Sequence, residues 1–229
     1  MDHCQATRAG GQGWKRALVA RLASIADTPE VLNEDSVDKD PVKQFAGWYQ
    51  DAIDAGDVLP EAMTVATSTA SGDPSARMVL LRGFDERGFG FFTNYESQKG
   101  RELAENPRAA LVIYWPKLGR QVRISGTVEK QSPEESAMYF HNRPRASQLS
   151  ALASPQSQVM ANRAELEDAV RALAARYQDE GIPLPPQWGG YRVVPTTIEF
   201  WLHRNNRLHD RLRYSRGPDG SWRIERLAP

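Results

Sequence analysis

Short runs in which hydrophobic and polar residues tend to alternate occupy the middle of the chain. These runs are MTVATSTA (63–70), ARMVLLRGF (76–84), FGFFTN (89–94), AALVIYW (109–115) and QVRISGTVEK (121–130). Turn sequences such as SGDP and DERG separate them, as expected for antiparallel strands joined by hairpins. The pattern returns near the C-terminus in TTIEFWLH, RLHDRLRY and SWRIERL. The sequence therefore predicts a mainly β domain.

A helix signal precedes the first of these strands. Asp40 and Pro41 suit the N-cap and the first helical position, and Gly56 suits the end of the helix. Between them an apolar stripe with helical spacing is formed by Val42, Phe45, Tyr49 and Ile53.

Further helices are predicted at the margins of the strands. The segment SQKGRELAEN (97–106) predicts a short helix, and residues 162–178 predict a longer one. Ser132 and Glu135 have the spacing of a capping box, which predicts a helix that runs toward Arg143. Many short strands with few helices favour a closed antiparallel barrel over a doubly wound sheet. We expect this α+β unit to span residues 40–229.

Residues 1–39 are expected to form an N-terminal extension that is flexible or partly helical. Within it, WKRALVARLASI (14–25) places apolar residues at helical spacing among basic ones. A loosely attached helix is the favoured interpretation, with a transit-like leader and a partner-binding segment as alternatives.

Composition excludes several classes of function. Lys plus Arg and Asp plus Glu are equal at 29 each, so no overall charge draws the chain to nucleic acid or to a membrane. The single cysteine, Cys4, excludes an internal disulfide framework and fits a reducing compartment. No apolar run approaches the roughly 20 residues that span a bilayer, so we expect a soluble, cytoplasmic protein. Neither G-x-G-x-x-G nor G-x-x-x-x-G-K-[ST] occurs, and the histidines lack zinc-binding spacing, so no metal is expected.

Basic and polar residues gather where a predicted strand ends and a helix begins. Thr93, Ser97, Gln98 and Lys99 share such a position, and the free backbone N–H groups of a helix start favour a phosphate there. These residues form the first candidate anion site.

A second group of basic residues gives another candidate anion site. Arg143, Arg145 and Ser147 follow the helix that Pro144 is expected to break.

Two arginines flank the strand RMVLLR. Arg77 opens this strand and Arg82 closes it, so their odd separation predicts opposite faces and different anions.

The segment NNRLHDRLRY (205–214) concentrates positive charge. If it is a strand, Arg207, His209, Arg211 and Arg213 share one face. Such a row is either well solvated or matched to a bound anion.

Several motifs resemble those of one enzyme family. They are, in order, ARMVLLRGFDERGFGFFTNYESQKGRELAENPRAAL, YWPKLGRQVRISG, YFHNRPRASQLSALASPQS, PLPPQWGGYRV and IEFW…RLHDRLRY…W…RLAP. From about Asp40 to Pro229 the chain is similar to pyridoxine (pyridoxamine) 5′-phosphate oxidases. The resemblance implies an FMN-binding split barrel that works as a homodimer, with two active sites at the subunit interface.

The resemblance also assigns residues to the cofactor FMN. It implies that Arg77 and Lys99 bind the FMN phosphate. The full set of implied FMN contacts is Arg77, Met78, Val79, Leu80, Leu81, Arg82, Phe92, Thr93, Gln98, Lys99, Gln121, Gln156, Ser157, Trp201 and Arg211. Some of these are implied to reach across from the second subunit.

The resemblance assigns a second set to the substrate. Arg82, Tyr139, Arg143 and Ser147 are implied to hold the substrate phosphate. Arg207 and His209, the implied catalytic residues, would hold the pyridine ring over the flavin. The implied reaction is hydride transfer from pyridoxamine or pyridoxine 5′-phosphate to FMN, which gives pyridoxal 5′-phosphate, followed by reoxidation with O2 to yield H2O2.

This chain departs from the family pattern at a few positions. Arg82 replaces the usual lysine, and Gln98 stands where relatives often have a basic residue. Leu202 and His203 replace a common Gln-Gly pair, and the lid motif that many relatives carry is not found upstream of Leu32. Two alternatives therefore stay open: an FMN split-barrel oxidase with another substrate, as in phenazine biosynthesis, and a non-catalytic module that binds flavin or pyridoxal phosphate.

Overall fold

The computed structural model describes residues 31–229. The helix expected within residues 14–25 lies outside the described residues. Within them the strands form one sheet in which every strand pair is antiparallel. The strands are β1 (Ala62–Ser68), β2 (Pro74–Leu80), β3 (Phe84–Asp85), β4 (Gly88–Asn94), β5 (Arg108–Trp115), β6 (Arg120–Lys130), β7 (Trp188–Leu202), β8 (Asp210–Arg216) and β9 (Trp222–Arg226).

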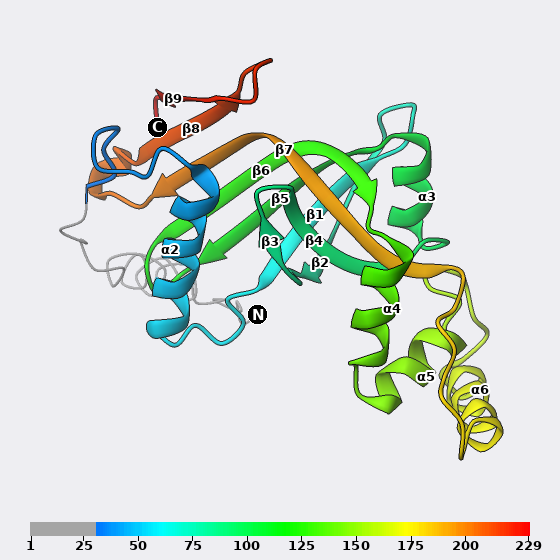
Figure 1. The fold of residues 1–229 in the computed structure, drawn as a ribbon. Coiled ribbons are helices and arrows are strands. Elements are labelled where there is room, and N and C mark those ends of the chain that lie inside the picture. The colour runs from blue at the N-terminus through cyan, green and yellow to red at the C-terminus, as the bar shows by residue number, and fades with distance from the viewer. Residues whose placement is uncertain (1–30) are drawn as a thin grey trace, which may run out of the picture.

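The sheet divides at β7. Its main path runs β2-β1-β5-β6-β7-β4-β3, while β8 pairs with β7 and β9 pairs with β8. The first half of β7 pairs with β4 and the second half with β8, so the hairpin β8–β9 extends away from the barrel (Figure 1). β6 follows β7 along both halves, with a register shift at Ser125/Gly126. A Cβ on Gly126 would lie 2.0 Å from the carbonyl oxygen of Val194, so only glycine fits this bulge.

Five helices in the described part of the chain flank the sheet. They are α2 (Pro41–Asp54), α3 (Gln98–Glu105), α4 (Pro133–His141), α5 (Arg145–Ala153) and α6 (Arg163–Arg176). The predicted helix starts are confirmed: Asp40 caps α2, Ser97 caps α3, and Ser132 forms a complete capping box with Glu135 at the start of α4. Figure 1 shows α2 at one end of the barrel, whereas α4, α5 and α6 project from the other end.

Two hydrophobic cores hold these layers together. In the larger core, Phe45 and Trp48 of α2 pack edge-on against Phe89 and Phe200 of the sheet, with ring centroids 4.9 and 5.2 Å apart. The smaller core lies among α4–α6 and the start of β7, around Phe140, Leu149, Ile182 and Trp188. The mainly β, antiparallel fold with flanking helices is thus confirmed. Separately, no helix in residues 31–229 is long and apolar enough to cross a membrane.

Several sequence predictions of local structure were wrong. β2 ends at Leu80 instead of continuing to residue 84, and β7 begins at Trp188, eight residues before the predicted run TTIEFWLH. Residues 207–209 do not belong to a strand, because a 3₁₀ turn (Asn205–Arg207) precedes β8. Helix α5 was missed because Pro144 was interpreted as a helix breaker, whereas it occupies the N-cap of a new helix.

Candidate active site

A cavity of about 840 Å³ opens between the free edge of β2 and helices α4 and α5. Four cationic residues line it, and no Asp or Glu does. These cations are Arg77, Arg82, Lys99 and Arg143. Thirteen of the residues predicted to bind cofactor or substrate line this cavity: Arg77, Met78, Val79, Leu80, Arg82, Phe92, Thr93, Lys99, Tyr139, Arg143, Ser147, Gln156 and Ser157.

Lys99 lies at one end of the cavity and has only neutral partners. Its Nζ donates to Thr93 Oγ1 at 3.0 Å, Ser97 Oγ at 3.3 Å and Gln156 Oε1 at 3.0 Å. It forms no ion pair with any carboxylate of residues 31–229. Burial, together with the nearby charge of Arg77, lowers the pKa of Lys99 to about 8. A buried cation without a counter-ion favours an anionic ligand.

Arg77 stands beside Lys99 but is tied to a buried carboxylate. Its Nη2 donates to Ser75 Oγ at 2.6 Å and lies 3.4 Å from Glu102 Oε2. Burial by itself raises the pKa of Glu102, but hydrogen bonds from Ser75, Thr67 and Gln98 outweigh it and, with the charge of Arg77, lower the pKa to about 2. Glu102 therefore stays ionised and orients Arg77.

Two of the predicted cofactor residues near this end do not line the cavity. Gln98 donates through Nε2 to Glu102 Oε1 at 2.9 Å, so it supports the carboxylate that orients Arg77. Leu81 is 5% exposed and belongs to the larger hydrophobic core. Direct contact of either residue with a cofactor stays a prediction.

Arg143 marks the other end of the cavity. Its guanidinium carbon lies 5.0 Å from the ring centroid of Trp188, and its buried Nη1 has no hydrogen-bond partner among the described residues. Burial, together with the charge of Arg82, lowers the pKa of Arg143. Among residues 31–229, Arg82 has one loose ion pair, with its Nη1 3.8 Å from Glu61 Oε1. Two cations with spare donors thus face this end, which suits a second anion.

An aromatic stack builds the wall next to Arg143. The rings of Phe92 and Tyr139 are 4.0 Å apart and nearly parallel, and Phe92 is stacked on Trp188 at 5.5 Å. The strand β4 supplies Phe92, α4 supplies Tyr139 and β7 supplies Trp188, so the wall joins three elements. Its rigid faces limit how far Arg143 can turn.

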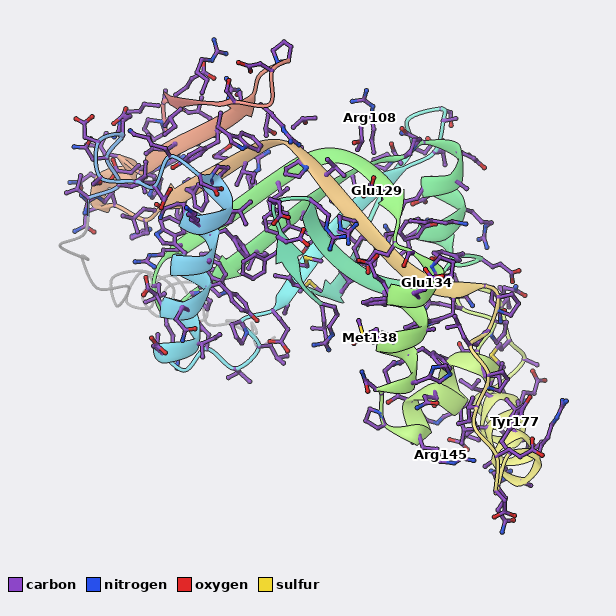
Figure 2. The ribbon with its side chains drawn as sticks, in the orientation of Figure 1. Arg108, Glu129, Glu134, Met138, Arg145 and Tyr177 are labelled. Carbon is purple, nitrogen blue, oxygen red and sulfur yellow. The ribbon has the colours of Figure 1, made fainter. Side chains whose placement is uncertain are left out.

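The start of α5 contributes to this end through Ala146 and Ser147, which line the cavity in the first turn of the helix. Arg145 does not join them, contrary to the second candidate anion site that the sequence suggested. It donates through Nη1 to the carbonyl of Glu180 at 3.1 Å and through Nη2 to the carbonyl of Tyr177. Figure 2 labels Arg145 and Tyr177 at the outer end of the α4–α6 unit. Arg145 therefore fastens α5 to the chain that leaves α6.

The prediction that strand alternation separates Arg77 from Arg82 was wrong, whereas their assignment to different anions stays a prediction. Both side chains line the same cavity. β2 ends at Leu80, and the backbone then turns through Gly83 with φ +132°, so strand alternation no longer applies at Arg82.

The remaining predicted residues lie outside the cavity, near the other end of the sheet. Gln121, Trp201 and Arg211 are cross-strand neighbours on β6, β7 and β8. The ring of His209 lies 4.5 Å from that of Trp201. We call Gln121, Trp201, His203, His209 and Arg211 the C-terminal cluster. In Figure 1 the β8 end of the sheet lies far from α4–α6, so one chain does not bring this cluster to its own cavity.

Two of the four basic residues in segment 205–214 are paired with carboxylates. Arg211 donates to Glu199 Oε1 at 2.9 Å, and Arg213 donates to Glu225 Oε2 at 3.1 Å, so neighbouring strands supply carboxylates. Arg207 is different: it is exposed, has no partner among the described residues and takes a left-handed conformation with φ +63°. The left-handed backbone conformation costs free energy for a non-glycine residue, and residues held in it often lie at functional sites.

Comparison with known proteins places the chain in a family. Residues 50–177 match the sequence profile of pyridoxamine 5′-phosphate oxidase, and residues 188–229 match that of the pyridoxine 5′-phosphate oxidase C-terminal dimerisation region. The chain belongs to the pyridoxamine 5′-phosphate oxidase family. A pyridoxine/pyridoxamine 5′-phosphate oxidase of Salinibacter ruber is 56% identical over 200 residues, which cover 86% of this chain and 93% of that protein. One of Trichormus variabilis is 55% identical over 202 residues, 88% and 94% of the two chains.

Solved structures agree with this family assignment. PhzG from Burkholderia lata, in complex with tetrahydrophenazine-1-carboxylic acid, superposes with a TM-score of 0.83 at 32% identity and covers 89% of this chain and 100% of PhzG. A pyridoxamine 5′-phosphate oxidase-related, FMN binding protein from Nostoc punctiforme has the same fold, with a TM-score of 0.65 at 19% identity over 81% of this chain and 97% of that protein.

Some residues of this oxidase-family cavity were missed by sequence reasoning. Asn94, Ser150, Ser154 and Trp188 line it, and Trp188 carries the cation–π contact to Arg143. Trp188 was within reach of the sequence, because the motif WGG was noted. Its neighbour Gly189 has room for no Cβ, which would lie 2.1 Å from the hydroxyl of Tyr95, so the motif reflects close packing around Trp188.

Proposed function

We propose that this chain oxidises pyridoxamine 5′-phosphate or pyridoxine 5′-phosphate to pyridoxal 5′-phosphate, with FMN as cofactor, O2 as electron acceptor and H2O2 as product. One observation carries the proposal: the cavity is lined by two pairs of interacting cations, Lys99 with Arg77 and Arg143 with Arg82, and by no carboxylate. Two such pairs suit two phosphorylated ligands, because several charge-assisted hydrogen bonds are needed to hold each dianion away from water.

The end that contains Lys99 and Arg77 fits the phosphate of FMN. Lys99 is buried and lacks a counter-ion, and Thr93 and Gln156 lie within hydrogen-bond distance of its Nζ. Glu102 holds Arg77 in place from the side. The backbone of β2 forms the edge of the sheet beside this end, so its free polar groups would face the flavin ring. FMN supplies the hydride acceptor when bound.

The end that contains Arg143 fits the phosphate of the substrate. The unpartnered Nη1 of Arg143 supplies a donor, Arg82 supplies a second charge, and Ser147 supplies a hydroxyl. Tyr139 is fixed by its stack on Phe92 and can form one side of this phosphate-binding site. These residues bind and orient the substrate.

The site would be completed by the C-terminal cluster of a second copy of the chain. Tyr114, Gln121, Trp201 and Arg211 are consecutive neighbours across β5, β6, β7 and β8, so they form one row on the sheet surface. Tyr114 is 47% exposed in the single chain. A homodimer that buries this row would bring Arg207 and His209 of one subunit to the cavity of the other.

In this assembly the protein contributes orientation and electrostatics. Arg207 and His209 would hold the pyridine ring so that its C4′ carbon faces the flavin. The substrate loses a hydride from C4′ and a proton from its alcohol or amine; the amine route then consumes one water and releases ammonia. Because no carboxylate lines the cavity, we assign no strong acid–base pair.

The first experiment uses the purified full chain. Absorbance at about 450 nm reports bound flavin. Pyridoxine 5′-phosphate is then added in air, and formation of H2O2 and pyridoxal 5′-phosphate is measured. Bound flavin without either product contradicts the proposed reaction, and absence of flavin contradicts the proposed cofactor.

Two variants test whether the cavity holds separate binding sites for FMN and for the substrate. Lys99→Ala is expected to lose flavin, whereas Arg207→Ala is expected to keep flavin and lose turnover. Arg108→Ala is the matched control, since Arg108 is exposed and lies outside both the cavity and the C-terminal cluster (Figure 2). Equal loss of flavin in Lys99→Ala and Arg207→Ala would show that the FMN and substrate binding sites are not separate.

A second candidate function is favoured by the likeness to PhzG, whose structure contains a tetrahydrophenazine. In this alternative the same FMN site oxidises a reduced phenazine in place of the vitamer. His203, which differs from the family pattern, lies within the C-terminal cluster, where it would face such a ligand. Its ring centroid is 5.2 Å from that of His209. Parallel assays with pyridoxine 5′-phosphate and a dihydrophenazine carboxylic acid decide between the two substrates.

A further inference from the structure

Three aromatic rings meet in the C-terminal cluster. His209 lies 4.5 Å from Trp201 and 5.2 Å from His203, and Trp201 and His203 are 6.1 Å apart. Trp201 is near the end of β7, His203 follows that strand, and His209 directly precedes β8. The ring of His209 is therefore enclosed on two sides by side chains from the end of one neighbouring strand.

A backbone hydrogen bond fixes the protonation pattern of His209. The N–H of Arg204 donates to His209 Nδ1 at 3.1 Å, so this nitrogen must carry a lone pair. A proton on Nδ1 would place two N–H groups against each other. The neutral ring therefore carries its proton on Nε2, the nitrogen that the Arg204 contact leaves free.

The loop that places Arg204 is itself anchored. The Arg204 guanidinium donates through Nε to Asp210 Oδ2 at 2.9 Å, and Arg226 donates to Asp210 Oδ1 at 2.9 Å. His203 N donates to the carbonyl of Gly119 at 2.8 Å, which ties the start of the loop to the turn before β6. Both ends of the loop are thus held, and the Arg204 N–H is directed at His209.

The charges around His209 oppose a second proton on its ring. On the loop, His203, Arg204 and Arg207 are basic, and Arg211 follows on β8. The nearby carboxylates are already engaged, because Asp210 binds Arg204 and Arg226 while Glu199 binds Arg211. Burial lowers the pKa of His209, and the charges of His203 and Arg207 lower it further.

We propose that His203 and the Arg204 N–H are positioning groups that hold His209 as the neutral tautomer with its proton on Nε2. His209 then presents an N–H donor to an acceptor atom on the pyridine ring of the substrate. Its hydrogen bond keeps the same direction throughout the pH range in which an ordinary histidine gains a proton. This inference rests on the proposed function for its substrate, but the state of the His209 ring can be measured without turnover.

The test is an NMR titration of the full chain with ¹⁵N-labelled histidine, from pH 5 to 9. Signals are assigned by comparison with His209→Gln. In the wild type we expect His209 to show a protonated Nε2 and an unprotonated Nδ1 at pH 7, and to gain its second proton below the ordinary histidine pKa. In His203→Gln we expect its proton affinity to rise about 3- to 10-fold, because a neighbouring positive charge has been removed.

A matched control and an activity readout accompany the titration. His141 is exposed at the end of α4, outside the cavity and the cluster, so His141→Gln should leave the His209 titration unchanged. In His203→Gln the acid limb of the kcat/KM profile should move to higher pH with the His209 titration. A wild-type His209 that is protonated on Nδ1 at pH 7, or that titrates identically in wild type and His203→Gln, overturns the inference. A chain that fails to oxidise the vitamer but shows the expected titration contradicts only the proposed function.

Discussion

Subunit complementation gives the most direct test of an active site shared between two chains. The Arg143→Met variant damages the cavity, and Arg207→Ala damages the C-terminal end. Arg143 is half-buried against Trp188, whereas Arg207 is exposed at the far end of the sheet, so neither change touches the surroundings of the other. Each removes one charge-assisted contact worth about 1.5–3 kcal/mol, so each homodimer should lose about 10- to 150-fold in kcat/KM.

The mixed dimer is expected to behave differently from both parents. One of its two sites combines Arg143→Met with Arg207→Ala, while the other receives intact residues from both chains. It should therefore show about half of the wild-type activity per dimer. Co-expression of the two variants with different affinity tags, followed by two successive affinity steps, isolates this species. A wild-type dimer that carries both tags is the control.

The reasoning is refuted if the mixed dimer is no more active than the mean of its two parents. In that case each site would lie within a single chain, and the separation between helices α4–α6 and the β8 end of the sheet in Figure 1 would have to be closed by a rearrangement of the fold. Flavin content is measured on the same samples, so that loss of cofactor is not mistaken for loss of turnover.

Two further predictions concern stability. The pKa of Lys99 falls from 10.5 to about 8 on folding, so this side chain binds more protons in the unfolded chain between these values. The contribution of Lys99 to the unfolding free energy of the flavin-free protein should therefore rise by up to about 3 kcal/mol as pH increases through this window. Lys99→Met should lack this rise in urea denaturation at a fixed protein concentration, and parallel pH profiles for the two proteins would contradict the assignment. Ser132→Ala removes the cap of α4, where Ser132 Oγ accepts from Glu135 N at 3.1 Å, and should lower the unfolding free energy by about 1 kcal/mol. A change below about 0.3 kcal/mol would mean that the end of this helix is held by other contacts.

Local rules predicted the elements whose signals lie within a few residues of each other. The N-caps Asp40 of α2 and Ser132 of α4 follow from side chains that bind backbone N–H groups two or three residues away, and both were confirmed, as was the short helix α3. The same local view failed at α5, because Pro144 can end one helix or begin the next, and the packing of Leu149 in the smaller core decides between them.

The candidate site was predictable in its composition but not in its arrangement. Lys99 and Thr93 were expected together, and their side chains are hydrogen-bonded. The convergence of Arg77 and Arg82 could not be read from strand alternation, because it depends on where β2 ends. Pairing of Arg211 with Glu199 depends on the register of β7 and β8, which joins residues 12 positions apart. Such long-range geometry leaves little trace in a single sequence.

Strand β7 has a mechanical consequence for the enzyme. It carries Trp188 beside the cavity and Trp201 within the C-terminal cluster, so one strand connects the cavity of a chain to its C-terminal cluster. At about 3.3 Å per residue, its contour between these tryptophans is roughly 40 Å. The number of residues in β7 therefore fixes how the two regions lie relative to each other. One inserted residue would turn every later side chain of the strand to the opposite face and displace the C-terminal cluster. The length of β7 therefore sets the positions of the cavity and of the C-terminal cluster at once.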